Sequence, residues 1–483
     1  MSKTLFTIPP EYISRISPRA NTLPKYRNDF MRDRDRIMYC TAFRRLAGKT
    51  QIYTIGSDDH KKNRLTHSLE VAQIARTISL ALGLNEELAE AIALGHDLGH
   101  TPFGHAGEST LHSIMCPKSE AVKDSPFYHK EANDIWSTIQ RESTPLPDII
   151  EENSMFGFKH NIQSVRVASI LEDGYRGING ENIGLNLTNY TLWGMLHHSK
   201  IRYDAKDLYP NYQNQFSEHI NIRDNNKEAW SFEAYIVEWA DDIAQWHHDL
   251  EDAVRGDALP IGSICYLITE AFGSILSTTD KKVINSIQSL QSLDRKSLAD
   301  LSHIVVNTLI TNLVETSTEK LHVLEEKMAE KYPNKSIEEK ARILFLNKNC
   351  LEKVSMKESI TLSEEIKTSV FKETIRSYVH HSKDVERMNA KGQYIIKKLF
   401  EAYNSHPQQL PDGVILHFMV DIGKYETIEK ARLNGMGIIR TEFGKMMENP
   451  KTVYRCQLMR RICDHIACMT DRYAIEEYNN LYG

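Results

Sequence analysis

The sequence has 483 residues, of which 41% are hydrophobic and 26% are charged, a composition that excludes an intrinsically disordered chain. Fifty-nine Lys and Arg residues stand against 65 Asp and Glu residues, and the net charge of -6 excludes a general basic surface for nucleic acid. The length allows one large domain or two ordinary domains with a substantial core.

The first 29 residues contain several prolines and no helical periodicity, so we expect an irregular arm there. From Asp29 the pattern becomes helical, and Ile37, Phe43 and Leu46 can share one inward side. Five arginines surround that side, and a solvated face is the expected place for most of them: Arg32, Arg34, Arg36, Arg44 and Arg45.

Two successive helices follow, and each places a histidine on or near its apolar face. Apolar residues at helical spacing between Val71 and Leu82 put His67 near the start of a helix of about four turns. Asn85 is a typical N-cap for the next helix, whose apolar face continues one turn beyond Ile92 to His96. We therefore expect His96 to point inward.

Asp97 follows His96 directly, and a loop rich in glycine and proline then carries His100 and His105. One interpretation is that His67 and His96 are hydrogen-bonded core histidines and that Asp97 is a charge at a helix end. A metal site is favoured for the group as a whole, because burying several ionisable side chains without a partner is costly. Two imidazoles and a carboxylate are also common ligands of divalent transition metals.

Downstream of this loop, Glu108 lies three residues after His105 and is a helical neighbour if a helix begins that early. A carboxylate there could orient the imidazole, or it could simply be favoured by the helix dipole. Residues 117–150 contain several prolines and are expected to form a connection. His160 then begins another polar motif, either as an assistant to an acid or as a helix-end residue, and a further helix is expected to be capped near Thr188.

A long helix is expected from Trp230 to Val254, with one apolar stripe and one polar stripe. The polar stripe contains Asp241, Gln245 and Asp249, and such a stripe usually faces solvent. Asp242 competes with Asp241 as a candidate ligand. Beyond residue 260 the pattern stays helical, with lysine- and glutamate-rich solvated stretches at 318–341.

Two strings of residues carry a family resemblance. The segment Arg64-Leu-Thr-His-Ser-Leu-Glu-Val-Ala-Gln-Ile-Ala-Arg76 and the segment His96-Asp-Leu-Gly-His-Thr-Pro-Phe-Gly-His105 resemble the bacterial deoxyguanosine triphosphate triphosphohydrolases (dGTPases), which belong to the HD phosphohydrolase superfamily. Weaker similarity extends from about residue 18 to the end of the chain.

This resemblance implies a mainly α fold, in which an HD-domain helical core is followed by additional C-terminal helices. A few short strands are expected, for example over residues 51–55. The expected division is an N-terminal arm at 1–29, the HD catalytic core at 30–260, and a C-terminal helical region at 261–483 that completes the pocket and makes subunit contacts.

The resemblance also implies roles for individual residues. The metal ligands would be His67, His96, Asp97 and Asp241, and the catalytic group would be His105 as proton donor with Glu108 and His160. The expected substrate contacts are Gln51 to the 3'-hydroxyl, Arg64 and His100 to the phosphates, Asp249 near the triphosphate, and Gln245, where relatives often have a tyrosine.

The expected activity is metal-dependent hydrolysis of a deoxynucleoside triphosphate, dGTP above all, to deoxynucleoside and inorganic triphosphate. The expected cofactor is a divalent metal ion. Mg²⁺ and Mn²⁺ are the favoured ions, and other transition metals are the alternatives. Alternatives are another HD-superfamily nucleotide phosphohydrolase and a nucleotide-sensing regulator with a vestigial site. A homo-oligomer is expected, with an allosteric nucleotide or single-stranded DNA as a further partner.

Seven cysteines, an odd number without a CxxC pair, indicate free thiols and a reducing, cytoplasmic compartment. The group at Cys456, Cys463, His465 and Cys468 falls within one expected helix, at spacings unsuited to a closed zinc site. The first ten residues lack the apolar core of a signal peptide. The apolar run at 258–279 contains Glu270, so a buried or subunit-contact helix is expected there rather than a membrane span.

Overall fold

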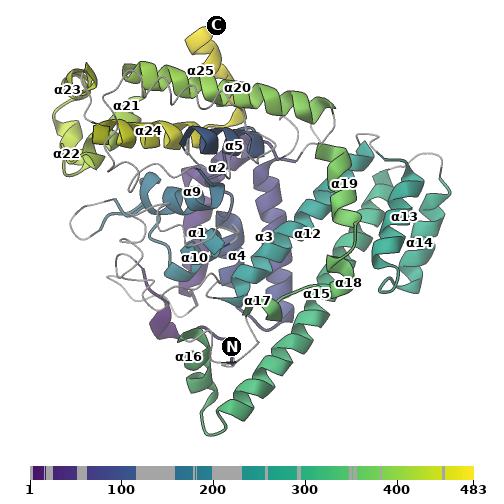
Figure 1. Cartoon of the computed structure of the whole chain (residues 1–483). Helices are drawn as coiled ribbons and strands as arrows, with labels where there is room; N and C mark the ends of the chain where they lie inside the picture. Colours follow the sequence, from purple (N-terminus) through teal and green to yellow (C-terminus); the bar gives the residue numbers. More distant parts are fainter. Residues whose placement is uncertain are drawn as a thin grey trace.

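The protein is described by a computed structural model covering residues 4–15, 17, 26–51, 62–115, 158–177, 180, 182–197, 231–255, 259–290, 295–346, 351, 356–380, 383–448 and 452–483. The mainly helical fold is confirmed (Figure 1). The first half of the chain contains α1 (Asp29–Tyr39), α2 (Thr41–Arg45), α3 (Arg64–Ala81), α4 (Glu86–Gly95), α5 (Gly104–Met115), α9 (His160–Arg166), α10 (Asn189–His197) and α12 (Phe232–Arg255).

The second half begins with α13 (Ile261–Phe272), α14 (Thr278–Gln288), the long α15 (Arg295–Lys331) and α16 (Ile337–Leu346). It continues with α17 (Met356–Ser359), α18 (Glu364–Lys367), α19 (Phe371–His380), α20 (Lys383–Ser405), α21 (Asp412–Asp421), α22 (Ile428–Leu433), α23 (Met436–Glu448), α24 (Thr452–Ala467) and α25 (Asp471–Tyr482).

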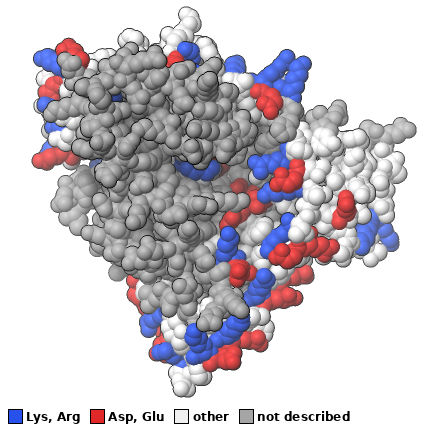
Figure 2. Space-filling view, viewed as in Figure 1, with Lys and Arg blue, Asp and Glu red and all other residues white. Residues whose placement is uncertain are grey.

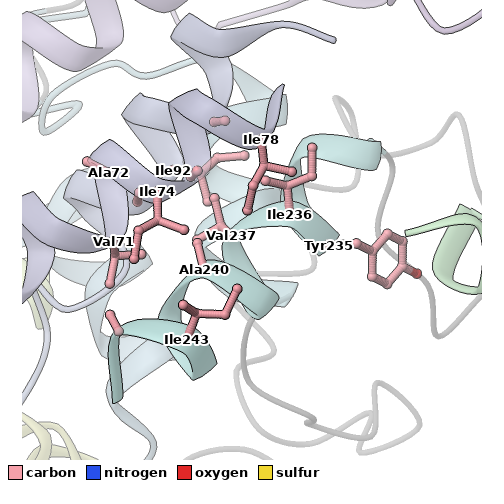
Figure 3. Packing of buried hydrophobic residues seen from close by; sticks show 14 of the residues in the cluster. Val71, Ala72, Ile74, Ile78, Ile92, Tyr235, Ile236, Val237, Ala240 and Ile243 are labelled. Atoms are coloured by element: carbon pink, nitrogen blue, oxygen red, sulfur yellow. The ribbon is translucent and has the colours of Figure 1, made fainter. Parts of the chain in front are cut away.

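Helices α3, α4 and α12 form the centre of the first hydrophobic core, and Figure 3 shows their apolar side chains packed against one another. Ile78 of α3, Ile92 of α4 and Ile236 of α12 are fully buried. The side chains recur every three or four residues, so each helix turns one continuous apolar face toward the other two. This packing brings His67, His96 and Asp241 onto neighbouring helices.

Local side-chain caps fix where these helices start, and the sequence predicts those at Asn85 and Thr188. The side chain of Asn63 accepts a hydrogen bond from the backbone N–H of Thr66, and the Thr66 hydroxyl accepts one from the backbone N–H of Asn63, so α3 begins with a capping box. Asn85 caps α4 through Leu88 N at 2.9 Å. Thr188, where a cap was also expected, accepts from the backbone of Thr191 at the start of α10.

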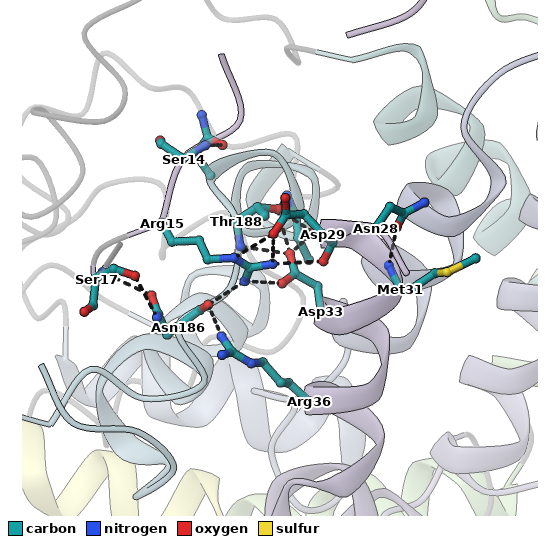
Figure 4. Close-up of polar contacts among 12 residues, drawn as sticks. Ser14, Arg15, Ser17, Asn28, Asp29, Met31, Asp33, Arg36, Asn186 and Thr188 are labelled. Atoms are coloured by element: carbon teal, nitrogen blue, oxygen red, sulfur yellow. Dashed lines mark hydrogen bonds and ion pairs between the residues drawn. The ribbon is translucent and has the colours of Figure 1, made fainter. Parts of the chain in front are cut away.

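The described part of the N-terminal arm is held against α1 by charge. Arg15 donates to Asp29 and Asp33 of α1 and to the backbone carbonyl of Asn186 (Figure 4). Arg36 corrects the expectation of a solvated face at its position, because it is 8% exposed and donates to the carbonyls of Leu185 and Asn186. A guanidinium can be buried there because backbone oxygens satisfy its N–H groups.

A second hydrophobic core lies where the C-terminal helices α20, α21, α24 and α25 pack over α5 (Figure 1). Phe103, Leu111 and Ile114 of the α5 region share this core with Leu399 of α20 and Ile462 of α24. The segment that carries His105 and Glu108 is therefore packed between the central helices and the C-terminal helices.

Within the described residues, β pairing consists of three isolated bridges: Arg15 with Thr188, Thr50 with Asn63, and Arg176 with Asn182. The strand expected at 51–55 and the connection expected at 117–150 lie outside the described residues, except for Gln51. Cys40, Cys265, Cys463 and Cys468 are free thiols. On the described part of the face in Figure 2, acidic and basic side chains are intermixed along the lower edge rather than segregated by sign.

One described helix, α15, is long and apolar enough to pass a test for a membrane span by length and composition alone. In the structure, 44% of its apolar window is buried inside the protein. The expected apolar run at 258–279 contains α13, whose residues Ile264, Ile268 and Phe272 are fully buried.

Candidate metal centre and active site

Four side chains from three helical segments converge at the centre of the first core. Nε2 of His67, near the start of α3, lies 2.7 Å from Oδ1 of Asp241 in α12. Nε2 of His96, at the end of α4, lies 3.5 Å from Oδ1 of Asp97 and 3.8 Å from Oδ1 of Asp241. Ligand atoms of His67, His96 and Asp97 all lie within 4.8 Å of one another. The four residues predicted as metal ligands are thus brought together.

The environment keeps this cluster in the protonation states that a metal needs. Nδ1 of His96 lies 2.5 Å from the carbonyl oxygen of Ala93. A carbonyl only accepts, so Nδ1 carries the proton and, in a neutral ring, Nε2 keeps its lone pair on the side of the two aspartates. Burial alone would raise the pKa of Asp97, but the interactions with the His96 imidazole and the Arg64 guanidinium hold that pKa well below its usual value. Asp97 is therefore an ionised carboxylate.

Arg64 joins this centre through Asp97, because its Nη1 donates to Oδ2 of Asp97 at 2.7 Å. Both side chains are nearly fully buried, which makes the pair an integral part of the site rather than a surface ion pair. One oxygen of Asp97 thus faces His96 and the other faces the guanidinium. The expected phosphate-binding residue is directly connected to the expected metal site.

A second cluster, next to the first, contains three histidines and a glutamate. The rings of His100 and His160 are stacked with centroids 4.4 Å apart, and the ring of His105 lies 5.5 Å from that of His100. Glu108 connects them, with Oε2 placed 2.5 Å from Nδ1 of His160 and 3.7 Å from Nδ1 of His105. Helix α5 begins at Gly104, so Glu108 and His105 are neighbours on one helical turn.

The side chains of this second cluster differ in charge state and in exposure to solvent. Burial would raise the pKa of Glu108, but the charge of His160, the nearby imidazole of His105 and the hydrogen bond from His160 hold that pKa well below its usual value. Burial lowers the pKa of His100 well below its usual value, with the charge of Arg64 acting in the same direction. The side chain of His105 is 51% exposed, in contrast with its buried neighbours. His105 is therefore the member of the cluster that a ligand can reach.

A cavity of about 430 Å³ opens beside His105. Gln51, Glu108 and Lys159 line it from the first half of the chain, and Arg376 and Asn389 line it from the C-terminal helices α19 and α20. The amide oxygen of Gln51 is buried and has no hydrogen-bond partner among the described residues. Two cationic side chains and an unsatisfied amide in one cavity suit a ligand that carries both anionic and hydroxyl groups.

The two adjacent aspartates of α12 point in different directions. Asp241 faces His67, whereas Oδ1 of Asp242 lies 2.7 Å from Nζ of Lys372 in α19. The alternative ligand that the sequence leaves open is therefore engaged on the other side of the helix. Trp239 and Trp246 flank these positions on the apolar stripe, and Trp246 packs against Phe272 and Phe371.

Asp249, two turns beyond Asp241, is 2% exposed rather than solvated. Burial raises the pKa of Asp249 to about 7, with the positive charges of Arg376 and Lys372 opposing that rise. The polar stripe of α12 thus faces the protein interior and α19, in contrast to the usual solvent-facing position of such a stripe. Gln245, between Asp241 and Asp249 on the stripe, is half-buried.

Lys159 and Arg376 were not singled out by the sequence. Nζ of Lys159 lies 2.5 Å from Oε1 of Glu108, and its position next to His160 is the one local signal that could have indicated it. Arg376 reaches the cavity from α19, far along the chain, and no spacing pattern connects it to the histidines. A further group, Glu70 with His247 and His248, lies beside His67, whose ring is 5.2 Å from that of His248. Lys62 forms ion pairs with Glu70 of this group and with Glu251.

The donor set at the first cluster fits a divalent cation. It combines imidazole nitrogens with carboxylate oxygens, its protein atoms lie within one coordination sphere of each other, and Asp97 is held ionised. The mixed nitrogen and oxygen donors suit Mg²⁺ less than Mn²⁺, Fe²⁺ or Zn²⁺ by ligand type alone.

Comparison with known families places the chain in a class. The HD domain family matches residues 64–152, and the phosphohydrolase-associated domain family matches residues 360–421 and 428–480. The first match contains His67, His96, Asp97, His100, His105 and Glu108 but neither His160 nor Asp241, and the second contains α18–α24 and most of α25. The fold and the site are those of an HD-domain, metal-dependent phosphohydrolase.

Similarity to individual proteins narrows this class. The chain is 32% identical over 460 residues to a deoxyguanosinetriphosphate triphosphohydrolase-like protein of Rickettsia felis, covering 94% of this chain and 92% of that protein. Proteins with the same description from Geobacter metallireducens and Azoarcus sp. are each 29% identical, over 95% and 98% of this chain and 89% and 95% of their own length. The chain belongs to the family of dGTPase-like HD phosphohydrolases.

Proposed function

We propose that this protein hydrolyses a deoxynucleoside triphosphate, with dGTP as the expected substrate, to deoxynucleoside and inorganic triphosphate. The observation that carries the proposal is the continuity of the site. Asp97 belongs to the metal cluster, His100 follows it in the histidine cluster, and His105 opens from that cluster into a cavity lined by cations. The names of the relatives supply the substrate class.

His67, His96, Asp97 and Asp241 would hold the divalent cation. When bound, such an ion supplies Lewis acidity toward a phosphate oxygen and toward water. The side chains of the protein bind the substrate, place positive charge beside its phosphates and supply the proton for the leaving group.

The reaction needs a proton on the departing 5'-oxygen when water attacks the α-phosphorus. His105 is the proposed donor because it is the exposed imidazole of its cluster and lies against Glu108. Glu108 stabilises the protonated imidazole of His105, and Nδ1 of His160 lies 2.5 Å from the same carboxylate oxygen. Because Glu108 stays ionised over the whole neutral range, it can favour protonation of the acid without giving up its own charge.

Substrate contacts follow from the side chains around the cavity. Arg64, which contacts the metal cluster through Asp97, and His100 of the histidine cluster are the proposed phosphate contacts. Arg376 and Lys159 add positive charge at the cavity wall. Gln51 offers its unsatisfied amide to the 3'-hydroxyl of the sugar. Asp249 and Gln245 of α12 are further proposed substrate contacts, and Gln245 stands where relatives often carry a tyrosine.

The wider assignments are also proposals. The enzyme acts in the cytoplasm, which the free thiols of the described cysteines support. It assembles as a homo-oligomer, with an allosteric nucleotide or single-stranded DNA as its regulator. The proposed division is an arm at 1–29, a catalytic core at 30–260 and a C-terminal region at 261–483. Residues from both sides of position 260 line the cavity, which supports a C-terminal region that completes the pocket.

A product analysis tests the proposal. Each of the four deoxynucleoside triphosphates is incubated alone and in pairs with Mg²⁺ or Mn²⁺, and the products are separated by chromatography. Intact inorganic triphosphate with a deoxynucleoside is expected. Release of monophosphate or diphosphate would instead indicate another HD nucleotide hydrolase. No turnover, or equal turnover by His96→Ala and Asp97→Ala variants, would contradict metal-dependent catalysis.

A further inference from the structure

Asp471, the first residue of α25, reaches two separate segments of the active site. It is 2% exposed. Its Oδ2 accepts the backbone N–H of Thr50 at 3.0 Å and the Thr50 hydroxyl, and its Oδ1 accepts the backbone N–H of Phe103 at 2.9 Å. One carboxylate from the C-terminal end of the chain therefore connects two segments that lie far apart in the sequence.

The two segments carry the proposed sugar contact and the proposed acid. Thr50 directly precedes Gln51, and Phe103 is followed by Gly104 and His105. They also touch each other, because a Cβ atom at Gly104 would lie 3.5 Å from the carbonyl oxygen of Gln51. A shift of either segment would change the distance between the sugar contact and the acid.

The second segment adopts a backbone conformation that needs outside support. Phe103 has a φ of 60° and Gly104 a φ of 59°, so a bulky aromatic residue occupies the left-handed region. Such a residue costs on the order of 1–3 kcal/mol and persists only where its surroundings fix it. The hydrogen bond from Phe103 N–H to Asp471 is one such support.

Two further contacts from the C-terminal helices act on the same stretch. Gly392 of α20 lets the Phe103 side chain approach so closely that a Cβ there would lie 2.6 Å from Phe103 Cβ. Buried Lys49 donates to the carbonyl oxygens of His100 and Ala467, which joins the histidine loop to the end of α24. The conformation of residues 100–105 is therefore set jointly by the core and by the C-terminal helices.

We propose that Asp471 is a positioning residue that holds Gln51 and His105 at a fixed separation across the cavity. The inference rests on the proposed function for the roles of those two side chains. A carboxylate is needed because both of its oxygens accept, so that it satisfies backbone N–H groups from two segments at once. By this arrangement the phosphohydrolase-associated region completes the active site without supplying a reacting group.

The test compares two Asp→Asn variants within the C-terminal region. Asp471→Asn replaces one accepting oxygen by an NH₂ donor, which faces a backbone N–H and breaks one of the two connections. Asp421→Asn is the matched control, because Asp421 pairs with Arg461 in the same region and does not reach the cavity segments. We expect Asp471→Asn to lower kcat/KM by about 10- to 100-fold, and Asp421→Asn by less than about threefold.

A merely structural role would lower the amount of folded enzyme without changing substrate discrimination. Wild type should discriminate a deoxynucleotide from its 3'-deoxy analogue through Gln51, and Asp471→Asn should lose most of that preference. Combining it with Gln51→Ala should give a loss smaller than the product of the two single losses. Bound metal per chain should stay unchanged in Asp471→Asn, since none of the four proposed ligands contacts Asp471.

Hydrogen exchange gives a measurement that does not depend on the activity. Backbone amides of residues 100–105 should exchange faster in Asp471→Asn than in wild type and in Asp421→Asn. If Asp471→Asn does not fold, Thr50→Val serves instead, because it removes only the hydroxyl donor; a smaller change in the same direction is expected. Unchanged exchange together with kinetics that match the control would overturn the proposal. If wild type itself releases no triphosphate but exchange still responds, the proposed function fails while the structural connection stands.

Discussion

Nε2 of His67 lies 2.7 Å from Oδ1 of Asp241, while the adjacent Asp242 turns away and pairs with Lys372 at the same distance. Two neighbouring aspartates on one helix thus have separate environments. One faces the proposed cation site and the other joins α12 to α19. The pair offers a matched comparison within two consecutive residues.

We expect Asp241→Asn to lose bound metal and to lower kcat by more than about a hundredfold. Asp241 is a proposed direct metal ligand, and loss of a direct ligand should cost more than loss of a residue that only hydrogen-bonds to a ligand. Asp242→Asn should keep its metal and most of its activity, since only a partly exposed ion pair is lost. Metal content per chain, measured after gel filtration, together with turnover, checks both expectations. Equal metal content in the two variants would remove Asp241 from the ligand set.

Glu108 provides the second prediction. Glu108→Gln keeps the shape of the side chain but removes the negative charge beside His105 and His160. The protonated imidazole is then less stable, so kcat should fall by about 10- to 100-fold and the loss of activity at high pH should begin at a lower pH. A pH profile of kcat measures this shift.

Lys159→Gln is the comparison for Glu108→Gln, because Lys159 contacts the other oxygen of the same carboxylate. It leaves the contact between Glu108 and His160 in place and should therefore change KM more than the shape of the pH profile. If Glu108→Gln showed an unchanged profile, another group would have to hold the acid in its protonated form.

Parts of this arrangement could be predicted from the sequence because they are local. The start of α3, the start of α4 and the inward position of His96 follow from N-caps and from a 3.6-residue periodicity. The spacing of His105 and Glu108 is likewise a property of one helical turn. Each of these features depends on only a few neighbouring residues, and the structure shows each at the position that the sequence pattern predicts.

Other parts depend on packing between distant segments, which no single-sequence pattern contains. The direction of Asp241 and Asp242 is set by α3 on one side and α19 on the other. Arg36 is buried because the carbonyls of residues 185 and 186 reach it. Arg376 and Asp471 contribute to the site through the C-terminal helices, and their charges look like ordinary helix-surface charges in the sequence.

The buried carboxyl of Asp249 predicts an unusual pH dependence of stability. Its pKa is raised from 3.8 to about 7 by burial, so the native state holds this proton more tightly than the unfolded state does. A raised carboxyl pKa destabilises the native state increasingly as the pH rises from the unfolded value through the folded value. Asp249→Asn, which resembles the protonated acid, removes that cost.

Urea unfolding at pH 5 and pH 8 measures this effect. The free energy of unfolding should be higher in Asp249→Asn than in wild type, and the gain should grow by about 2–3 kcal/mol between the two pH values. A gain that is the same at both pH values would mean that the effect does not arise from ionisation of this carboxyl.

Arg376 gives the last prediction, since it is the cation that the C-terminal helices contribute to the cavity wall. A guanidinium that only binds phosphate oxygens stabilises the bound substrate and the transition state alike. Arg376→Gln should therefore raise KM by about tenfold or more with little change in kcat, and should weaken the dependence of KM on salt. Arg472→Gln is the matched control, because Arg472 is 88% exposed and pairs with Glu476 on the surface of α25. Should Arg376→Gln keep the wild-type KM as the control does, Arg376 would not be a phosphate contact.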